Sequence, residues 1–326
     1  MAAVLYVNSE DGTKCFQPVL QDGVSWATKR TGTPGKLTFK VIPDSILDFS
    51  EGSAVQFTDN EDKIFFGFVF KRERSKDGIV SVTAYDQIRY LKNKDTKIYT
   101  AKKAGQVVEM LAADLRLNLG EIEDTGYVIP KRTQPNTTFL DMIEDALALT
   151  LQNTKELFVL YDDFGKLTLK NIANMKVGSG ETFLMIDEET GRDFDYVTSI
   201  DDQTYNKIKL SYENEKAGKR EIYIAQSGEN MNRWGVLQYF DTLKKGENGQ
   251  AKADALLSLY NKKTRKLKIK DCFGDNRVRA GSMVVVNLKL DDMSVQNFMV
   301  VEECTHTYKE NEHTMDLTLR GGEFIA

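Results

Sequence analysis

The sequence has few of the residues that build disulfide scaffolds, flexible linkers and many active sites. Its 326 residues include three cysteines, five prolines and two histidines. The odd, sparse cysteine set (Cys15, Cys272 and Cys304) predicts no disulfide framework and indicates synthesis in a reducing compartment. So few prolines argue against long Pro-rich linkers.

Segments for export or membrane insertion are also lacking. Residues Met1 to Tyr6 have no basic region and no long apolar run, so we expect no signal peptide. No stretch approaches the roughly 18 apolar residues of a membrane-spanning helix. We therefore expect synthesis in the cytoplasm and no membrane segment.

Charge is balanced along the chain, with 44 basic and 49 acidic residues. The longest basic run, Lys262 to Lys266, is short and interrupted. Specific nucleic-acid binding usually needs a concentrated positive surface, so this class of function is disfavoured. The length predicts two or three folded domains.

Motifs for catalysis are missing or weak. There is no Walker loop and no Gly-x-Gly-x-x-Gly segment, and neither histidine accompanies a Gly-x-Ser-x-Gly motif. Adjacent acids could suggest glycoside hydrolysis, but they lie in predicted turns or loop-like segments, where such pairs are usually solvated. These pairs are Asp162-Asp163, Glu188-Glu189, Asp201-Asp202 and Asp291-Asp292. We assign no catalytic residue and expect no cofactor.

Cys304, His306 and His313 are the nearest approach to a metal-binding set. Cys304 and His306 share a face of one predicted strand, and His313 could lie opposite across a hairpin. Three such ligands would suit an open zinc site. The alternative is ordinary packing within the hairpin, which we favour, so no metal ligand is assigned.

Residues 1–98 are predicted to form an antiparallel β-barrel. Lys36 to Val41 and Val80 to Tyr85 alternate polar and apolar residues, which is typical of strands with one buried face. Between them, Phe65 to Phe70 is an aromatic strand, and Lys76-Asp77-Gly78 carries a hairpin turn signal.

Residues 99–178 change to a helical period and are predicted to form a small α/β module. Apolar residues recur at helical spacing from Val107 to Leu115 and from Phe139 to Leu147. Thr138 and Asp141 resemble a capping box before the second helix. A hairpin is predicted over residues 157–172.

Residues 179–326 are predicted to form a second β-barrel, with a loop and a helix inserted at 226–262. A weak repeat links the two β portions, because Gly52 to Phe57 resembles Gly281 to Val286. In each portion an acidic turn, a long strand, a polar turn and an alternating strand follow. We interpret the chain as β-rich and multidomain (α+β), with two related antiparallel tube-like barrels separated by the module. Alternatively, two unrelated meanders align by chance.

The repeat suggests an assembly. Three copies of a chain with two similar barrels would present six similar units in a closed ring, which would also cover exposed strand edges.

Several ordered segments resemble the XkdQ/YqbQ family of baseplate hub proteins from contractile phages and phage-tail-like bacteriocins. The main segment is Asp86 to Asp95. Supporting segments are Arg30 to Phe39, Gly67 to Phe70, Thr204 to Ile208, Arg233 to Gln238, and His306 with His313 to Met315.

The resemblance implies a homotrimeric structural hub that joins the tail tube, or a tube-initiator protein, to the central spike. It also implies contacts with a LysM-bearing tail protein and with baseplate wedge proteins. DNA would only pass through, and only in a phage. Assembly would occur in the bacterial cytoplasm, with release by lysis. The fused lysozyme or peptidase domain of some related hubs is not expected here.

Five residues are candidates for interfaces. Asp86, Arg89 and Tyr90 could lie at a subunit or domain interface, or form an internal corner between barrel and module. Arg233 and Trp234 could anchor a partner, or Trp234 could pack on its own barrel. Two other functions stay open: a cell-wall (peptidoglycan) hydrolase of the same particle, and a carbohydrate-binding module that uses Trp26 or Trp234.

Overall fold

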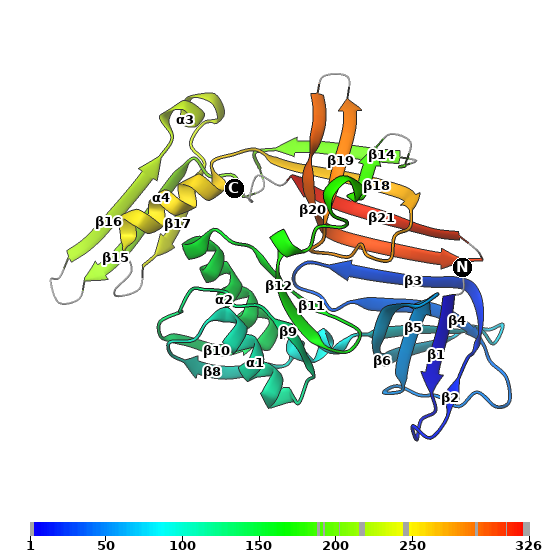
Figure 1. Cartoon of the computed structure of the whole chain (residues 1–326). Helices are drawn as coiled ribbons and strands as arrows, with labels where there is room; N and C mark the ends of the chain where they lie inside the picture. The colour runs from blue at the N-terminus through cyan, green and yellow to red at the C-terminus, as the bar shows by residue number, and fades with distance from the viewer. Residues whose placement is uncertain are drawn as a thin grey trace.

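The computed structural model (Figure 1) describes residues 3–187, 190–191, 193–201, 203–214, 219–243, 248–290, 293–310 and 312–321. The chain has four parts. We call them the first unit (3–86), the module (87–176), the second unit (177–199 and 264–321) and the insertion (200–263). In Figure 1 the first unit lies at the lower right, the second unit above it, and the module and insertion at the left.

The first unit is an antiparallel sheet with spatial order β2-β1-β5-β6-β7-β4-β3. Its predicted alternating strands form as expected: in β4 the side chains of Leu37, Phe39 and Val41 are buried. The strands are β1 (Ala3–Asn8), β2 (Cys15–Phe16), β3 (Val19–Lys29), β4 (Lys36–Ile42), β5 (Ala54–Asp59), β6 (Asp62–Arg74) and β7 (Val80–Tyr85).

The second unit repeats this strand order as β13-β19-β20-β21-β18-β14. In chain order, its strands correspond one by one to β1, β3, β4, β5, β6 and β7. One pairing differs, because β13 runs parallel to β19 whereas β1 runs antiparallel to β5. The elements are β13 (Met185–Asp187), β14 (Asp193–Ser199), β18 (Thr264–Phe273), β19 (Met283–Leu290), β20 (Met293–Lys309) and β21 (Glu312–Gly321), with the 3-10 turn η3 (Gly180–Thr182).

The two units share one sheet and do not form two closed barrels, so that part of the prediction is wrong. The outer edge of β3 bonds to β20 of the second unit, and no described strand pairs β3 with β1. The result is a mostly antiparallel 13-stranded sheet. The first unit does not close into a barrel because the free edge of β3 forms its backbone hydrogen bonds with β20 of the second unit and not with β1.

The module packs two helices against short sheets around its own apolar core. Both helices begin near the expected positions, and Thr138 caps α2 by accepting a hydrogen bond from the Asp141 amide at 3.1 Å. The elements are η1 (Gln87–Lys92), β8 (Lys94–Tyr99), α1 (Ala104–Leu115), β9 (Leu119–Ile122), β10 (Arg132–Thr138), α2 (Phe139–Thr154), β11 (Phe158–Asp162), β12 (Leu167–Asn171) and η2 (Ile172–Asn174).

The insertion is a small α/β unit with its own core, and it is wider than the loop and helix expected at 226–262. The sheet order is β16-β15-β17, and α4 covers it by packing Ala253 and Leu256 on Ile208 and Leu210. Its elements are β15 (Lys207–Asn214), β16 (Lys219–Gln226), α3 (Gly228–Trp234), β17 (Gln238–Thr242) and α4 (Gly249–Tyr260). Among the described residues, no helix is long and apolar enough to cross a membrane.

Candidate assembly interface

The two units share detailed backbone geometry where β5 and β19 begin. Gly52 and Gly281 have φ values of 96° and 95°. Each donates its amide to a residue of the next strand, Val69 or Val301, at 2.8 Å in both cases. Glycine suits this position because side chains disfavour positive φ.

A bulge follows at the same place in the long strand of each unit. The pairing of β6 with β7 shifts between Val69 and Lys71, and that of β20 with β21 shifts between Val301 and Glu303. Lys71 therefore corresponds to Glu303, and later residues of the two strands correspond in step. Because a bulge bends its strand, bulges at equivalent positions bend β6 and β20 at the same place, so the two units resemble each other in local geometry as well as in strand order.

The joint between the units is formed by β3 and the C-terminal half of β20. They pair antiparallel from Lys29 with Glu303 to Val24 with Tyr308. One face carries the Lys29–Glu303 salt bridge at 2.8 Å, which is about half exposed. On the other face the Trp26 ring stacks on His306, with ring centroids 5.1 Å apart. Trp26 is 4% exposed, so it cannot serve as a surface platform for a glycan.

A buried polar network accompanies this joint. His306 Nδ1 lies 2.8 Å from His313 Nε2, and His306 Nε2 lies 2.9 Å from the Val278 carbonyl oxygen. Both rings fit the network as Nε2–H tautomers, with His313 donating to His306 and His306 donating to Val278. Burial lowers the pKa of His306 to about 3, and also lowers that of His313.

Cys304 and His306 do lie near His313, as the strand pattern suggested. The Cys304 sulfur is 3.0 Å from His306 Nε2. However, both His306 nitrogens already face protein partners, and the described residues contain no group of three ligands that could hold a metal ion. Burial raises the pKa of the Cys304 thiol, which disfavours a thiolate.

Arg279 links both units and the module. Its guanidinium donates to the Asp162 carbonyl oxygen at 3.0 Å and lies over the Tyr161 ring at 4.1 Å. It also lies 5.7 Å from the Trp26 ring. The next residue, Ala280, donates its amide to Thr28 Oγ1 at 3.0 Å. The half-buried Arg279 therefore contacts the first unit and the module at the same point.

Asp86 lies beside this cation and caps η1. Its carboxylate accepts hydrogen bonds from the amides of Gly35 at 2.8 Å and Ile88 at 3.0 Å. Burial raises its pKa well above the usual value, and the nearby Asp162 carboxylate raises it further. The structure thus places Asp86 inside the chain, at the contact between the first unit and the module.

One of the paired acids, Asp162, differs from the expectation that these acids are solvated. Asp162 is 6% exposed and accepts from the Gly165 amide at 2.6 Å, whereas Asp163 and Asp201 are exposed. The other acids of these pairs, Glu188-Glu189, Asp202 and Asp291-Asp292, lie outside the described residues.

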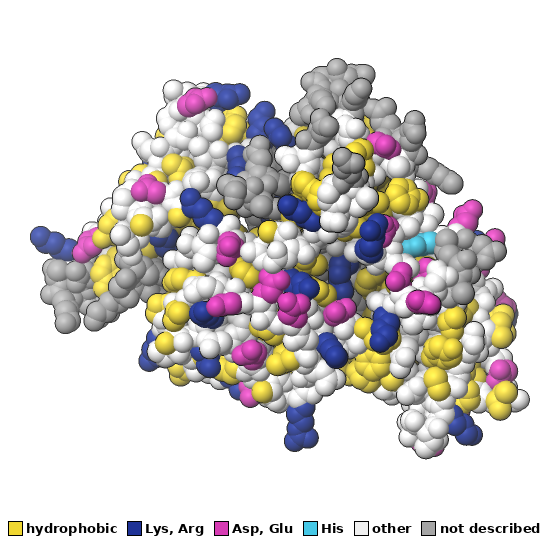
Figure 2. All heavy atoms as spheres, viewed as in Figure 1, with side chains coloured by type: hydrophobic (Ala, Val, Ile, Leu, Met, Phe, Trp, Pro, Cys, Tyr) yellow, Lys and Arg dark blue, Asp and Glu magenta, His cyan; other side chains and the backbone are white. Residues whose placement is uncertain are grey.

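Arg89 and Tyr90 lie on the outer face of β6. The Arg89 guanidinium is 5.2 Å from the Phe70 ring, and the Tyr90 ring contacts Phe68 and Phe70. Both residues are half-buried. Hydrophobic side chains gather over the first unit at the lower right of Figure 2.

Arg233 and Trp234 end α3 in the insertion, away from the joint (Figure 1). Arg233 is exposed and pairs with Glu229 at 3.7 Å, and Trp234 is half-buried. The short helix lies in a segment that the sequence pattern predicted as a loop.

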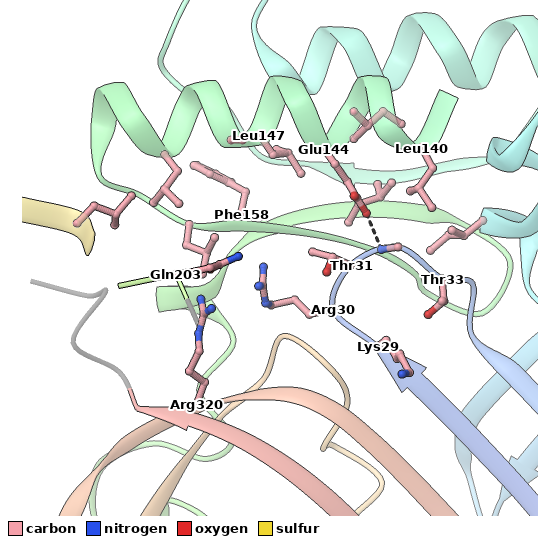
Figure 3. A pocket seen from close by; sticks show the side chains of 18 of the residues that line it. Lys29, Arg30, Thr31, Thr33, Leu140, Glu144, Leu147, Phe158, Gln203 and Arg320 are labelled. Carbon is pink, nitrogen blue, oxygen red and sulfur yellow. Dashed lines mark hydrogen bonds between the residues drawn. The ribbon is translucent and has the colours of Figure 1, made fainter. Parts of the chain in front are cut away.

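A cavity of about 310 Å³ lies where the four parts meet (Figure 3). Arg30 and Arg320 point into it and both pair with Glu302, at 2.9 and 3.1 Å. Opposite them, α2 contributes apolar side chains and Glu144, which accepts a hydrogen bond from the Gly32 amide at 2.5 Å. Burial raises the pKa of Glu144.

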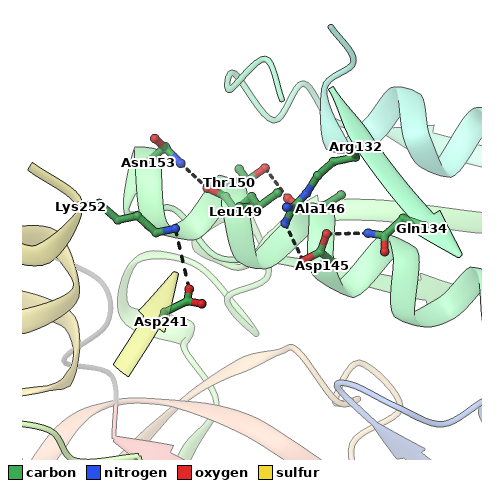
Figure 4. Close-up of polar contacts among 9 residues, drawn as sticks. All are labelled: Arg132, Gln134, Asp145, Ala146, Leu149, Thr150, Asn153, Asp241 and Lys252. Atoms are coloured by element: carbon green, nitrogen blue, oxygen red, sulfur yellow. Dashed lines mark hydrogen bonds and ion pairs between the residues drawn. The ribbon is translucent and has the colours of Figure 1, made fainter. Parts of the chain in front are cut away.

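A second cavity of about 590 Å³ separates α2 from α4 of the insertion (Figure 4). On the module side, Arg132 and Gln134 both bind Asp145, at 2.9 and 2.7 Å. On the insertion side, Lys252 lies 3.9 Å from Asp241. The polar contacts on the module side thus stay within the module, and the contact on the insertion side stays within the insertion.

Comparison with known proteins decides the family. The YQBQ-like family matches residues 24–320. The chain belongs to the YQBQ-like family. The resemblance that the ordered segments indicated is thus confirmed.

Two Bacillus subtilis relatives of this YQBQ-like protein match most of its length. YqbQ, an uncharacterised protein, is 29% identical over 92% of this chain and 91% of its own. XkdQ of the phage-like element PBSX is 30% identical over 82% of this chain and 81% of its own. The 43 kDa tail protein of prophage MuSo2 from Shewanella oneidensis has a similar fold, with a TM-score of 0.70 at 10% identity over 97% of both chains.

Sequence reasoning missed the role of three residues that hold the joint of this YQBQ-like protein together: Trp26, which was considered only for glycan binding, Thr28 and Arg279. One available signal was the alternation of Val24, Trp26 and Thr28 with small or polar residues, which is typical of a buried strand face. Arg279 had no such signal, because its partners are distant in sequence.

Proposed function

We propose that this YQBQ-like protein is a structural component of the baseplate hub in a phage tail or tail-like particle. Three copies would form a ring of six units that joins the tail tube to the central spike. The relationship to a protein of a phage-like element and the fold shared with a prophage tail protein support this proposal.

The observation that carries the proposal is the edge-to-edge joint between two units of the same strand order. This joint uses the edge of β3 in one unit and the edge of β20 in the other. The contact is head-to-tail, because the two edges differ. Head-to-tail contacts that repeat produce rings when the rotation closes, and filaments when it does not.

The further partners follow the family resemblance. They are the tail tube or a tube-initiator protein, the spike, a LysM-bearing tail protein and the baseplate wedge proteins. In a phage, DNA would pass through the ring without specific binding, and the formal charge of -5 gives DNA no general attraction. Assembly would take place in the bacterial cytoplasm, before release by lysis.

We propose that the protein acts by shape and edge complementarity and not as an enzyme. The described residues that line the cavity at the centre of the four parts include one carboxylate, Glu144, and no cysteine or histidine. The buried His306 is engaged by protein partners on both nitrogens. Incubation with purified peptidoglycan should release no fragments, and measurable release would contradict this proposal in favour of the hydrolase.

The mass of the purified protein in solution tests the ring directly. We expect a species with three times the 36.9 kDa mass of one chain. A protein that stays strictly monomeric even when it is concentrated would contradict the proposal.

A further inference from the structure

We propose that β6 of one copy pairs with β14 of the next copy, antiparallel, with Lys71 opposite Ser199 and Glu73 opposite Val197. This inference rests on the proposed ring and names the surface that would close it. The partner is a second copy of this chain.

Both strands present an edge that no described strand covers. Among the described strands, β14 pairs only with β18. In β6, residues Asp62 to Phe68 pair with β5, but from Lys71 to Arg74 the only partner within the described part of the chain is β7. The corresponding stretch of β20 is the one that receives β3 within the chain. An uncovered edge is a site for strand addition.

The internal joint supplies the register. Within the first unit Trp26 pairs with Leu37, which pairs with Ala84. Within the second unit Tyr196 pairs with Leu267, which pairs with Leu319. Ala84 and Leu319 are equivalent, because each pairs with the valine before the bulge.

Tyr196 therefore takes the place of Trp26, and the bulges place Arg74 at the position of His306. Because Trp26 pairs with His306, the same geometry pairs Tyr196 with Arg74 of the neighbouring copy. The positions opposite Glu73 and Lys71 follow in antiparallel order.

The side chains on the two edges suit each other. The Trp26–His306 stack would be replaced by the Arg74 guanidinium over the Tyr196 ring, a favourable cation–π arrangement. The end of β6 carries three cations and one carboxylate, whereas β14 carries two carboxylates and no cation. β14 also exposes 44% of Phe194 and 51% of Val197, which pairing would cover.

The joint between copies would therefore differ from the joint within a chain. Within the chain, the inner face is buried and includes Cys304, His306 and Tyr308. Between copies, the equivalent β6 positions include Arg72 and Arg74, which are exposed in one chain. The contact between copies should accordingly weaken with salt, while the contact within the chain should not.

Cysteine pairs test the register. In a Cys15→Ser background, which removes the exposed native cysteine, the E73C/V197C variant should form disulfides between chains when oxidised with copper–phenanthroline. Denaturing gels without reductant should show covalent dimers and trimers. Mixing the two single-cysteine variants should give dimers only, which confirms that the bond joins β6 to β14.

The matched control is E73C/T198C, in which the second cysteine moves by one residue to the opposite face of β14. It should cross-link at least about ten-fold less, because one-residue shifts reverse side-chain direction. The R72C/T198C pair, which restores the register, should again cross-link. It serves as the second test if E73C/V197C assembles poorly.

The outcomes separate this inference from the proposed function. A trimer that does not cross-link at 73–197 or at 72–198, or that prefers 73–198, overturns the register and leaves the ring in place. A wild-type protein that stays monomeric overturns both. Raising NaCl from about 0.1 to 1 M should dissociate the wild-type trimer, since the screening length falls from about 10 to 3 Å. An Arg74→Gln trimer with the same salt dependence as wild type would contradict the role of that cation.

Discussion

The buried, neutral His306 ring should make the folded chain less stable in mild acid. The ring is fully buried, and burial lowers its pKa from 6.5 to about 3. The unfolded chain therefore binds a proton below pH 6.5 that the folded chain does not. Stability due to this group is complete above pH 6.5 and falls as the pH decreases toward 3.

The size of the effect follows from linkage. Each pH unit below the unfolded pKa lowers the free energy of unfolding by about 1.36 kcal/mol per site. At pH 5 the loss for His306 alone is therefore about 2 kcal/mol. The lowered pKa of His313 acts in the same direction, because its ring is also buried, beside His306.

Urea unfolding measured by tryptophan fluorescence can test this. The chain has two tryptophans, so Trp234→Phe leaves Trp26, stacked on His306, as the only reporter. In this background we expect the free energy of unfolding to fall between pH 7.5 and pH 5. His306→Gln should be less stable at pH 7.5 but lose about 2 kcal/mol less on acidification. Equal losses in both proteins would refute the reasoning.

Four further substitutions have defined expectations for the free energy of unfolding, each measured in urea. Arg279→Met should cost about 3–5 kcal/mol, because it removes the cation beside two buried carboxylates; the loss should be larger at pH 7.5 than at pH 4.5, since those carboxyls have raised pKa values. An equal loss at both pH values would contradict this electrostatic role. Gly52→Ala and Gly281→Ala should each cost about 1 kcal/mol from positive φ, but Gly281→Ala should cost more, because its Cβ would lie 2.8 Å from Val159 whereas that of Gly52 meets nothing within 4 Å. Equal costs would argue against the close approach of module and second unit. Thr138→Ala should cost about 1 kcal/mol by removing the N-cap of α2, and no change would show that the cap is dispensable.

Local sequence patterns predicted much of the fold. The alternation in Lys36 to Val41 indicated which side chains of β4 are buried. The Gly-Ser pairs at Gly52 and Gly281 indicated two equivalent strand starts, and in the structure these glycines have the same φ and the same backbone hydrogen bond. The Thr138 cap and the helical spacing that follows it placed α2. These features depend on neighbours within a few residues, which is why a single sequence reveals them.

The joint and the insertion could not be predicted in the same way. Pairing of Trp26 with His306 joins residues 280 positions apart in sequence. No local sequence pattern predicts that the second edge of β3 pairs with β20. The alternating strands β15 and β16 are compatible with any half-buried sheet, so their place in a separate unit depends on α4 covering them. The half-buried position of Arg279 could not be predicted either, because its hydrogen-bond partner Asp162 is in the module, 117 residues away in sequence.

Electron microscopy of the purified assembly tests the central claim most directly. End-on class averages should show a closed ring with six similar lobes at low resolution. At higher resolution these lobes should alternate between first and second units around a three-fold axis, with β6 beside β14 of the neighbouring copy. An open or two-fold arrangement, or a ring in which the lobes of one kind contact only each other, would contradict the account.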